Sequence, residues 1–536
     1  MTTPVTDLSV PPDFNWAYDV VDRWAEDPHK LALRWIGPAG EERAITFAAL
    51  RERTNRLAGG LEGLGLARGD RVLLVLPRVV EWWESVLGLM KMGAVAMPGT
   101  SLLTAKDLAY RINAAEARAV ITDADGAARV DAIRAGCPSL ELLVIVGEPR
   151  PGWHSFAEVL AGGAAERSRL PTPSADPCMI YFTSGTAGNP KMVLHTHASY
   201  PIGHRITGAY WLALTPDDLH WNLSDTGWAK AAWSSLFGPW NMGAALFVHD
   251  GRGKYNPRET LELLQRYPVT TFCAAPTIYR LLVQEDLRAY RFPHLRSCTS
   301  AGEPLNPEVI AVWREATGIT VRDGYGQTES VLLCGNPPGQ ELRPGSMGKP
   351  LPGLTLAVID HEGNPLPPRR EGDLAVKVKP ERPVGLFKEY WRTPGATAAC
   401  HRGDWYVTGD RAYVDEDGYF WFVGRADDVI ISAGYRIGPF EVESALIEHP
   451  AVAEAAVVAK PDPARGAIVK AYVVLSSTAN PSEALAHELQ EFVKRNTAPY
   501  KYPREIEFVS ELPKTVSGKI RRVELRARAK QEASGQ

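Results

Sequence analysis

The sequence predicts an α/β protein with a large N-terminal domain and a small α+β C-terminal domain. Three observations support this: a length of 536 residues, strand-like and helix-like segments that alternate through the first part of the chain, and a change of pattern near residue 424. A chain of this length is long enough for more than one domain. With 45% hydrophobic and 23% charged residues, it is globular, which excludes disorder as a description of the whole chain.

The N-terminal elements follow in order. Thr46 begins a helix whose apolar residues recur at three- and four-residue steps through Leu64. Residues 71–76 then predict a buried strand, 80–92 a helix and 94–97 a second strand, which together make a βαβ unit. Further strand-like runs stand at 119–122, 142–146 and 178–184. The alternation predicts two βαβ-type subdomains, each a parallel sheet covered by helices.

From about residue 340 to 423 short strands and turns predict a small antiparallel β unit. In the last hundred or so residues, Gly438 and Pro439 open a helix through His449, strands follow from 453 and 468, then a helix near 482–495 and a strand at EIEFV. We place the domain boundary within residues 424–428. This gives an N-terminal domain of residues 1–426 and a mobile C-terminal domain of residues 427–536.

Charge and leader signals narrow the function classes. Basic and acidic residues number 59 and 63, a net charge of −4, and no run of five or six like charges stands out. A nucleic-acid partner is therefore not expected. The first twenty residues lack a basic start and an apolar stretch, and no long apolar run follows. We expect a cytoplasmic protein without a membrane span. The six cysteines show no CxxC spacing and predict buried fillers, not a zinc site.

The most informative segment is YFTSGTAGNPK at residues 181–191, where a strand enters a loop with hydroxyls, glycines and a lysine. Such a loop can wrap a polyphosphate, because glycines let backbone N–H groups approach while hydroxyls donate and lysine neutralises charge. An ordinary Gly/Ser/Thr turn is the alternative. The spacing is not that of a Walker loop, which disfavours a kinase or GTPase of that class.

This segment resembles the adenylate-forming superfamily of acyl- and aryl-CoA synthetases, amino-acid adenylation domains and luciferase. Five more segments match in order: DGYGQTES at 323–330, YVTGD at 406–410, GRADD at 424–428, SAGYRIGPFEVE at 432–443 and PKTVSGKIRR at 513–522. Within the superfamily, WNLSDTGWAKAAW and GRADDVIISAGYRIGPFEVESALIEHP are most similar to medium-chain acyl-CoA synthetases.

The resemblance implies an AMP-forming carboxylate–CoA ligase. A medium-chain, branched or small aromatic acid would attack the α-phosphate of ATP, with Mg²⁺, to give an acyl-adenylate and pyrophosphate, and coenzyme A would then displace AMP. Its partners would be the acid, ATP and CoA, with a homodimer left open. The alternatives are an adenylation enzyme that loads a carrier protein or an amine, and a non-catalytic acyl or nucleotide binder.

The nucleotide roles also come from the resemblance. Glu329 would hold the metal and act in catalysis with Thr186 and Lys519, Thr328 would contact the α-phosphate, Asp410 the ribose together with Arg425, and Tyr325 the adenine. Gly302, Glu303 and Pro304 would form the other wall, with Asp323 near the exocyclic amine. The expected ATP and AMP contacts are Thr183, Ser184, Gly185, Thr186, Gly188, Lys191, Gly302, Glu303, Pro304, Asp323, Gly324, Tyr325, Gly326, Gln327, Thr328, Asp410, Arg425 and Lys519.

The C-terminal domain would act by rotation. Lys519 would bridge carboxylate and phosphate during adenylation only, and Asp427 is the expected hinge. Gly434 would then face the pantetheine arm, with Tyr435 and Arg436 beside the CoA. Two residues depart from the usual pattern: Ala187 replaces a threonine, and Ile431 replaces an asparagine.

The acyl pocket is expected in WNLSDTGWAKAAWSSLFGPW, residues 221–240. Trp228 would limit its depth, Thr277 would lie on its far side near the carboxylate, and Gly326 would line it. At least half of the four tryptophans in this segment are expected to be ordinary core. After SAGEP, Asn306 as cap, Pro307 as first residue and Gly318 as terminator predict a helix.

Overall fold

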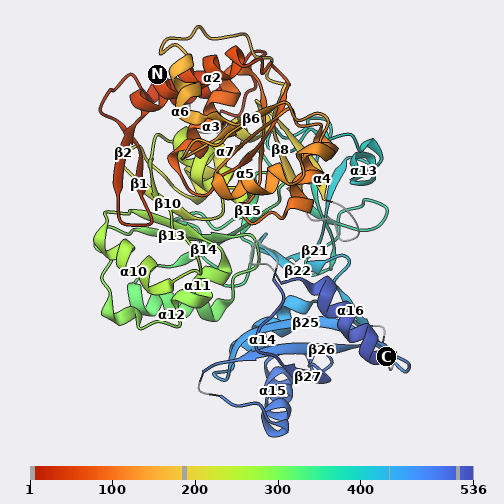
Figure 1. The fold of residues 1–536 in the computed structure, drawn as a ribbon. Coiled ribbons are helices and arrows are strands. Elements are labelled where there is room, and N and C mark those ends of the chain that lie inside the picture. The colour runs from red at the N-terminus through yellow and green to blue at the C-terminus, as the bar shows by residue number, and fades with distance from the viewer. Residues whose placement is uncertain (1–6, 184–189, 434, 478, 515–519, 535–536) are drawn as a thin grey trace.

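The computed structural model describes residues 7–183, 190–433, 435–477, 479–514 and 520–534 (Figure 1). Two large sheets, an antiparallel β unit and a small C-terminal α+β unit follow one another along the chain. The predicted α/β class is therefore confirmed. In the part of the chain that the structure describes, no helix combines the length and apolar character needed to cross a membrane.

The first large sheet has eight strands in the order β19-β9-β8-β4-β3-β5-β6-β7. Its strands are β3 (Arg71–Val75), β4 (Val95–Pro98), β5 (Ala119–Thr122), β6 (Leu142–Ile145), β7 (His154–Ser155), β8 (Pro177–Thr183), β9 (Lys191–Thr196) and β19 (Glu389–Tyr390). Its helices are α2 (Phe47–Gly63), α3 (Val80–Met92), α4 (Ala105–Ala115), α5 (Ala124–Asp131) and α6 (Phe156–Gly162). The βαβ unit β3-α3-β4 is confirmed, with β3 and β4 parallel. Thr46 caps α2, since its hydroxyl accepts from the Ala49 N–H.

The second sheet has nine strands in the order β16-β15-β14-β13-β12-β10-β11-β1-β2. They are β1 (Leu31–Ile36), β2 (Glu42–Thr46), β10 (Leu219–Leu223), β11 (Ala245–His249), β12 (Thr271–Ala274), β13 (Ser297–Ala301), β14 (Val321–Gly326), β15 (Leu332–Gly335) and β16 (Lys349–Pro350). The chain between β9 and β15 adds α7 (Ser199–Ile206), α8 (Ala229–Ala232), η4 (Trp233–Phe237), α9 (Gly238–Asn241), α10 (Pro257–Arg266), α11 (Pro276–Leu282) and α12 (Pro307–Thr317).

The order of this second sheet positions the candidate site. Strands β11, β10, β12, β13 and β14 run parallel to one another. Their carboxyl ends therefore meet at one edge, where ligands bind in open α/β sheets. The segments that leave this edge include the DTGW, AAPT, SAGEP and GQTES motifs.

The small β unit comprises β17 (Leu356–Ile359), β18 (Gly372–Lys377), β20 (His401–Arg402), β21 (Trp405–Val414) and β22 (Phe420–Arg425), with α13 (Pro394–Ala399) before β20. All of its strand pairs are antiparallel, as the sequence predicted. Strand β21 carries Asp410, which lies opposite Arg425 of β22 in the register.

The C-terminal elements match the predicted order. They are β23 (Ile430–Ser432), β24 (Tyr435–Ile437), α14 (Pro439–Ile447), β25 (Val452–Asp462), β26 (Gly466–Leu475), α15 (Glu483–Asn496), β27 (Glu505–Phe508) and α16 (Arg522–Ala533). They enclose an apolar core of their own and lie apart from the two large sheets, in blue in Figure 1. Helix α16 contacts the segment that precedes β23. Arg526 of this helix donates to the Asp427 carbonyl at 3.1 Å and pairs with the Asp428 carboxylate. The boundary and hinge near Asp427 stay predictions.

Candidate active site

The predicted phosphate loop connects two antiparallel strands. Thr183 ends β8 and lies opposite Lys191, the first residue of β9. The loop between them, with Ser184, Gly185, Thr186, Ala187 and Gly188, lies outside the described residues. The pairing places Thr183 and Lys191, the first and last predicted phosphate contacts of this segment, opposite each other.

Tyr390 joins the phosphate side to the predicted metal carboxylate. The ammonium of Lys191 lies 4.7 Å from the centre of the Tyr390 ring, and the Tyr390 hydroxyl donates to Oε1 of Glu329 at 2.8 Å. Burial raises the pKa of Glu329, although the Tyr390 hydrogen bond acts in the opposite direction. A positive charge close to Glu329 would stabilise the ionised form of this buried carboxylate.

Two aromatic side chains fix the backbone beside Glu329. The Thr328 carbonyl accepts from Nε2 of His195 at 2.8 Å and from the Tyr200 hydroxyl at 2.5 Å. The two rings stack with centroids 3.4 Å apart. Burial lowers the pKa of His195 to about 3, so the imidazole is neutral, with its proton on Nε2 and Nδ1 facing the Ser199 hydroxyl at 3.1 Å.

The predicted ribose carboxylate is held by two side chains of the GYGQTES segment. Asp410 is 7% exposed, and its Oδ2 accepts from the Tyr325 hydroxyl at 2.5 Å and from Nε2 of Gln327 at 2.7 Å. The Gln327 oxygen accepts from the Tyr406 hydroxyl at 3.1 Å. The structure therefore brings Tyr325, Gln327 and Asp410 together. Arg425 lies opposite Asp410 in the strand register, and its Nε is 3.4 Å from the Asp427 carboxylate.

Asp323 and Glu303 lie on the other side of the expected adenine site. The Asp323 carboxylate accepts from the backbone N–H groups of Leu305 at 3.1 Å and Gly324 at 2.9 Å, and burial raises its pKa to about 7. Gly302 has a φ of +114°, which favours glycine. Oε1 of Glu303 accepts from the Thr277 hydroxyl at 3.2 Å. Thr277, expected at the acyl side, therefore contacts a residue predicted for the adenine wall.

The tryptophans of residues 221–240 separate into two groups. Trp221 packs against Phe247 and Phe272, and Trp240 against Trp16 and Phe47, so both belong to the core as expected for half of the set.

The other two tryptophans of this segment have different surroundings. Trp233 is buried against Gly326, where an added Cβ would lie 2.7 Å from its ring and 2.5 Å from the Val331 carbonyl. Trp228 is half-buried and stands immediately before α8.

The backbone before Trp228 is rigidly held. The Asp225 carboxylate accepts from the Thr100 hydroxyl and from the Gly227 N–H, both at 2.8 Å. The Thr226 hydroxyl donates to the Leu76 carbonyl at 2.6 Å. A Cβ at Gly227 would lie 2.0 Å from the backbone nitrogen of Thr100. The first subdomain therefore fixes the position of the Trp228 segment.

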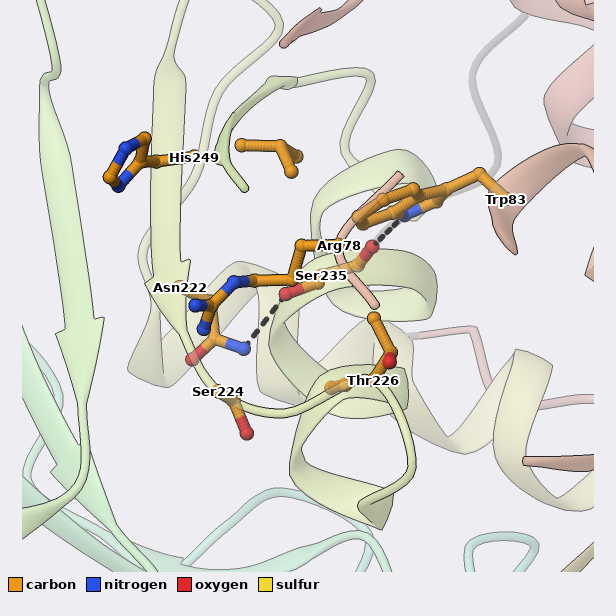
Figure 2. A pocket seen from close by; sticks show the side chains of 9 residues that line it. Arg78, Trp83, Asn222, Ser224, Thr226, Ser235 and His249 are labelled. Atoms are coloured by element: carbon orange, nitrogen blue, oxygen red, sulfur yellow. Dashed lines mark hydrogen bonds between the residues drawn. The ribbon is translucent and has the colours of Figure 1, made fainter. Parts of the chain in front are cut away.

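A small cavity lined by both polar and apolar side chains, Thr226 among them, lies beside this segment (Figure 2). Figure 2 shows Arg78, Asn222, Ser224 and Ser235 around it, with Asn222 donating to the Ser235 hydroxyl at 2.8 Å. Its volume is about 10 Å³, which holds about one water molecule. The cavity is too small for an acyl chain, and we assign it to packing.

The predicted CoA and catalytic residues of the C-terminal unit are only partly described. Gly434 and Lys519 lie outside the described residues. Ile431 is 59% exposed and Tyr435 51% exposed, and the Tyr435 ring stacks on Tyr500 with centroids 4.3 Å apart. Arg436 is also exposed. In this arrangement the described part of the predicted CoA turn faces solvent.

The side chains present agree with a magnesium ion bound mainly by the phosphates of the substrate. Within the described ranges no group of three or more His, Cys, Asp or Glu residues is arranged to hold a metal ion. The negative charge of Asp410 also raises the pKa of Glu329, so the Glu329 and Asp410 carboxylates act on the same part of the predicted site. Mg²⁺ is usually bound through one or two carboxylates plus substrate phosphates and water, and this arrangement fits Glu329.

Sequence reasoning missed the residues that support the site. Tyr390, His195, Tyr200 and Arg280 contact predicted site residues but stand outside the recognised segments. The only sequence signals were aromatic residues in LFKEYW and HTHASY. Such residues are also typical of ordinary core.

Comparisons with known proteins identify the family of this chain. The profile of the family "AMP-binding enzyme" matches residues 20–391, and that of "AMP-binding enzyme C-terminal domain" matches residues 441–519. The chain is 49% identical over 529 residues to human acyl-coenzyme A synthetase ACSM3, mitochondrial, covering 97% of this chain and 90% of the relative. It is 50% identical to mouse acyl-coenzyme A synthetase ACSM5, mitochondrial, with 96% and 91% covered.

Two solved structures share the fold. The anthranilate CoA ligase AuaEII in complex with anthranoyl-AMP superposes with a TM-score of 0.91 at 32% identity, covering 99% of this chain and all of the other. A benzoate CoA ligase from Burkholderia xenovorans LB400 gives 0.84 at 30% identity, with 96% and 100% covered.

The relatives named above correct one expectation. Their names describe mitochondrial proteins, which contradicts the cytoplasmic location expected from the first twenty residues. That prediction is wrong because its only support was the composition of twenty residues, whereas the relatives match 97% and 96% of the chain. By sequence, by architecture and by the matched segments, the chain belongs to the AMP-binding enzyme family.

Proposed function

We propose that this AMP-forming acyl-CoA synthetase acts on acids with an uncharged tail: medium-chain or branched fatty acids, or small aromatic acids. The observation that supports this substrate class is the Trp233 ring beside Gly326, which lies 2.7 Å from the position that a Cβ would take there, next to the backbone of Val331 and Leu332. Trp233 and Val331 are both buried in the apolar core. A charged tail would lose its hydration there without a described partner.

Trp228 is the proposed limit of pocket depth. It is half-buried, unlike Trp221, Trp233 and Trp240, and three hydrogen bonds hold the segment before it. An aromatic wall on a fixed backbone discriminates acids by length and width.

For the nucleotide, we assign Glu329 to Mg²⁺, Asp410 and Arg425 to the ribose, and the segment 183–191 to the phosphates. Bound magnesium supplies charge neutralisation between the two anions. Tyr390 keeps Glu329 oriented through its 2.8 Å hydrogen bond. Lys519, which precedes α16, supplies the second positive charge during adenylation.

An amino-acid substrate is disfavoured by the state of Asp225. The carboxylate that would pair with an α-ammonium group is already bound by Thr100 and Gly227, and burial raises its pKa. It therefore serves the fold of the Trp228 segment.

The test is a substrate panel. AMP release should be measured with C2 to C12 acids and substituted benzoates, with and without CoA. The proposal requires CoA-dependent AMP release that is largest for uncharged medium-length or aromatic acids. Acid-dependent pyrophosphate exchange with no release of AMP when CoA is added would indicate a carrier or amine acceptor, and ATP binding without exchange or AMP release would indicate a binder.

A further inference from the structure

Asn306 contacts two parts of the chain that the sequence did not connect. It occupies the predicted N-cap position of α12, with Pro307 first and Gly318 as the C-cap, but its side chain makes no capping hydrogen bond. The residue is 3% exposed. Its Nδ2 donates to the Ser444 hydroxyl of α14 at 3.1 Å, and its Oδ1 accepts from Nη1 of Arg280 at 3.2 Å.

Arg280 also binds Glu303, which is predicted to lie at the nucleotide. Its Nη2 donates to Oε1 of Glu303 at 2.8 Å, the same oxygen that accepts from Thr277 at 3.2 Å. Glu303 is one of the residues assigned to the adenine wall. Four hydrogen bonds therefore link Ser444 in the C-terminal unit to Thr277 and Glu303 in the N-terminal unit.

The C-terminal unit is oriented with α14 toward the N-terminal unit, because Ser444 of this helix meets Asn306. Arg522, the first residue of α16, binds the Glu443 carboxylate at 2.7 Å. Burial acts to lower the pKa of Arg522, but the Glu443 carboxylate bound to it raises the pKa overall. The described residues of the predicted CoA turn face solvent. This is the orientation expected for adenylation.

We propose that Asn306 is a positioning residue that couples docking of the C-terminal unit to the Glu303 carboxylate. In the adenylation orientation Ser444 binds Asn306, which holds Arg280, and Arg280 holds Glu303 at the nucleotide. Rotation for thioester formation moves Ser444 away and releases this restraint. The inference rests on the proposed function, since it assigns steps to the two half-reactions.

The test compares both half-reactions in three single variants and in the double variant that combines Ser444→Ala with Asn306→Ser. Ser444→Ala removes the docking bond alone, Asn306→Ser removes both side-chain contacts but keeps a residue suited to a helix N-terminus, and Ser510→Ala is the control on an exposed site of the same unit. Adenylation is measured as acid-dependent pyrophosphate exchange. Thioester formation is measured from supplied acyl-adenylate and CoA.

Ser444→Ala should slow adenylation about 3- to 10-fold, the scale of one hydrogen bond, and leave thioester formation within about twofold. Asn306→Ser should do the same and also raise the KM for MgATP. The double variant should be no slower than Asn306→Ser, because the two changes act on one connection. Ser510→Ala should match the parent protein.

Equal losses in both half-reactions, or no change in either, would overturn the coupling. A parent protein that performs neither half-reaction would instead refute the proposed function. In that case hydrogen–deuterium exchange still decides the structural claim: Ser444→Ala should raise exchange in α14 relative to Ser510→Ala, and unchanged exchange would refute the docking contact.

Discussion

The hydroxyl of Tyr390 donates a 2.8 Å hydrogen bond to Oε1 of Glu329, which lies 61 residues away in the sequence. The same ring carries the Lys191 ammonium on its face at 4.7 Å. One aromatic residue therefore touches the proposed metal carboxylate and the end of the proposed phosphate loop.

Tyr390→Phe keeps the ring and removes only the hydroxyl. We expect the KM for MgATP in adenylation to rise about 3- to 10-fold, the scale of one lost hydrogen bond, and the pyrophosphate-exchange assay measures it. Glu329→Gln should lower exchange much further, because it removes the negative charge that holds the metal. A Tyr390→Phe variant with an unchanged KM would show that this contact does not orient Glu329.

Trp228→Ala should shift acid preference toward longer or bulkier chains. The expected change is about 1–3 kcal/mol per methylene-sized difference in fit, read as ratios of kcat/KM across the C2 to C12 panel. Trp228→Phe is the matched control and should shift the profile less. An unaltered profile in Trp228→Ala would assign this residue to the core with Trp221 and Trp240.

Lys519→Ala should separate the two half-reactions. Adenylation should slow by about 10²- to 10³-fold, as expected for the loss of one preorganised charge donor. Supplied acyl-adenylate should still react with CoA at nearly the parent rate, because the C-terminal unit then carries Lys519 away. Single-turnover assays of each step provide the measurement, and equal loss in both would point to a structural role.

Gly434→Leu should have the reciprocal effect. A side chain at this position would narrow the passage for the pantetheine arm, so thioester formation should fall while acid-dependent pyrophosphate release is kept. The same two assays apply. Thermal unfolding of the variant serves as the control, since a damaged fold would lower both activities together.

Asp323→Asn should change stability in a pH-dependent way. Burial raises the Asp323 pKa from 3.8 to about 7, with Lys230 opposing and Glu303 adding to the rise. The folded state therefore keeps a proton that the unfolded state loses above about pH 4. The carboxyl group then destabilises the fold progressively as pH rises from about 4 to 7, and by a constant amount above that.

The variant lacks this titration. Relative to the parent, the free energy of unfolding of Asp323→Asn should improve by about 1 kcal/mol per pH unit across that window. Urea denaturation of both proteins at pH 5, 6, 7 and 8 measures the difference. A difference that is flat with pH would show that the Asp323 carboxyl ionises normally.

The sequence by itself determined the elements and their class. The helix α3 lies where apolar spacing predicted it, residues 80–92, and the strands β3, β4 and β5 fall within or beside the predicted runs. The C-terminal order from α14 to β27 was also readable. These features depend on hydrophobic periodicity and on turn and cap residues, which are local properties of a chain. The matched segments likewise predicted that Gln327 and Asp410 share one site, and Nε2 of Gln327 donates to Oδ2 of Asp410 at 2.7 Å.

Only the tertiary structure decided how these residues are held and charged. Tyr390 reaches Glu329, and His195 with Tyr200 reaches the Thr328 carbonyl, across long stretches of sequence. Asn306 looked like a helix cap from its neighbours, yet its amide binds Ser444, 138 residues away. The physical reason is that the hydrogen-bond partners and the desolvation of a side chain depend on which distant segments pack against it. A local sequence pattern does not specify that packing.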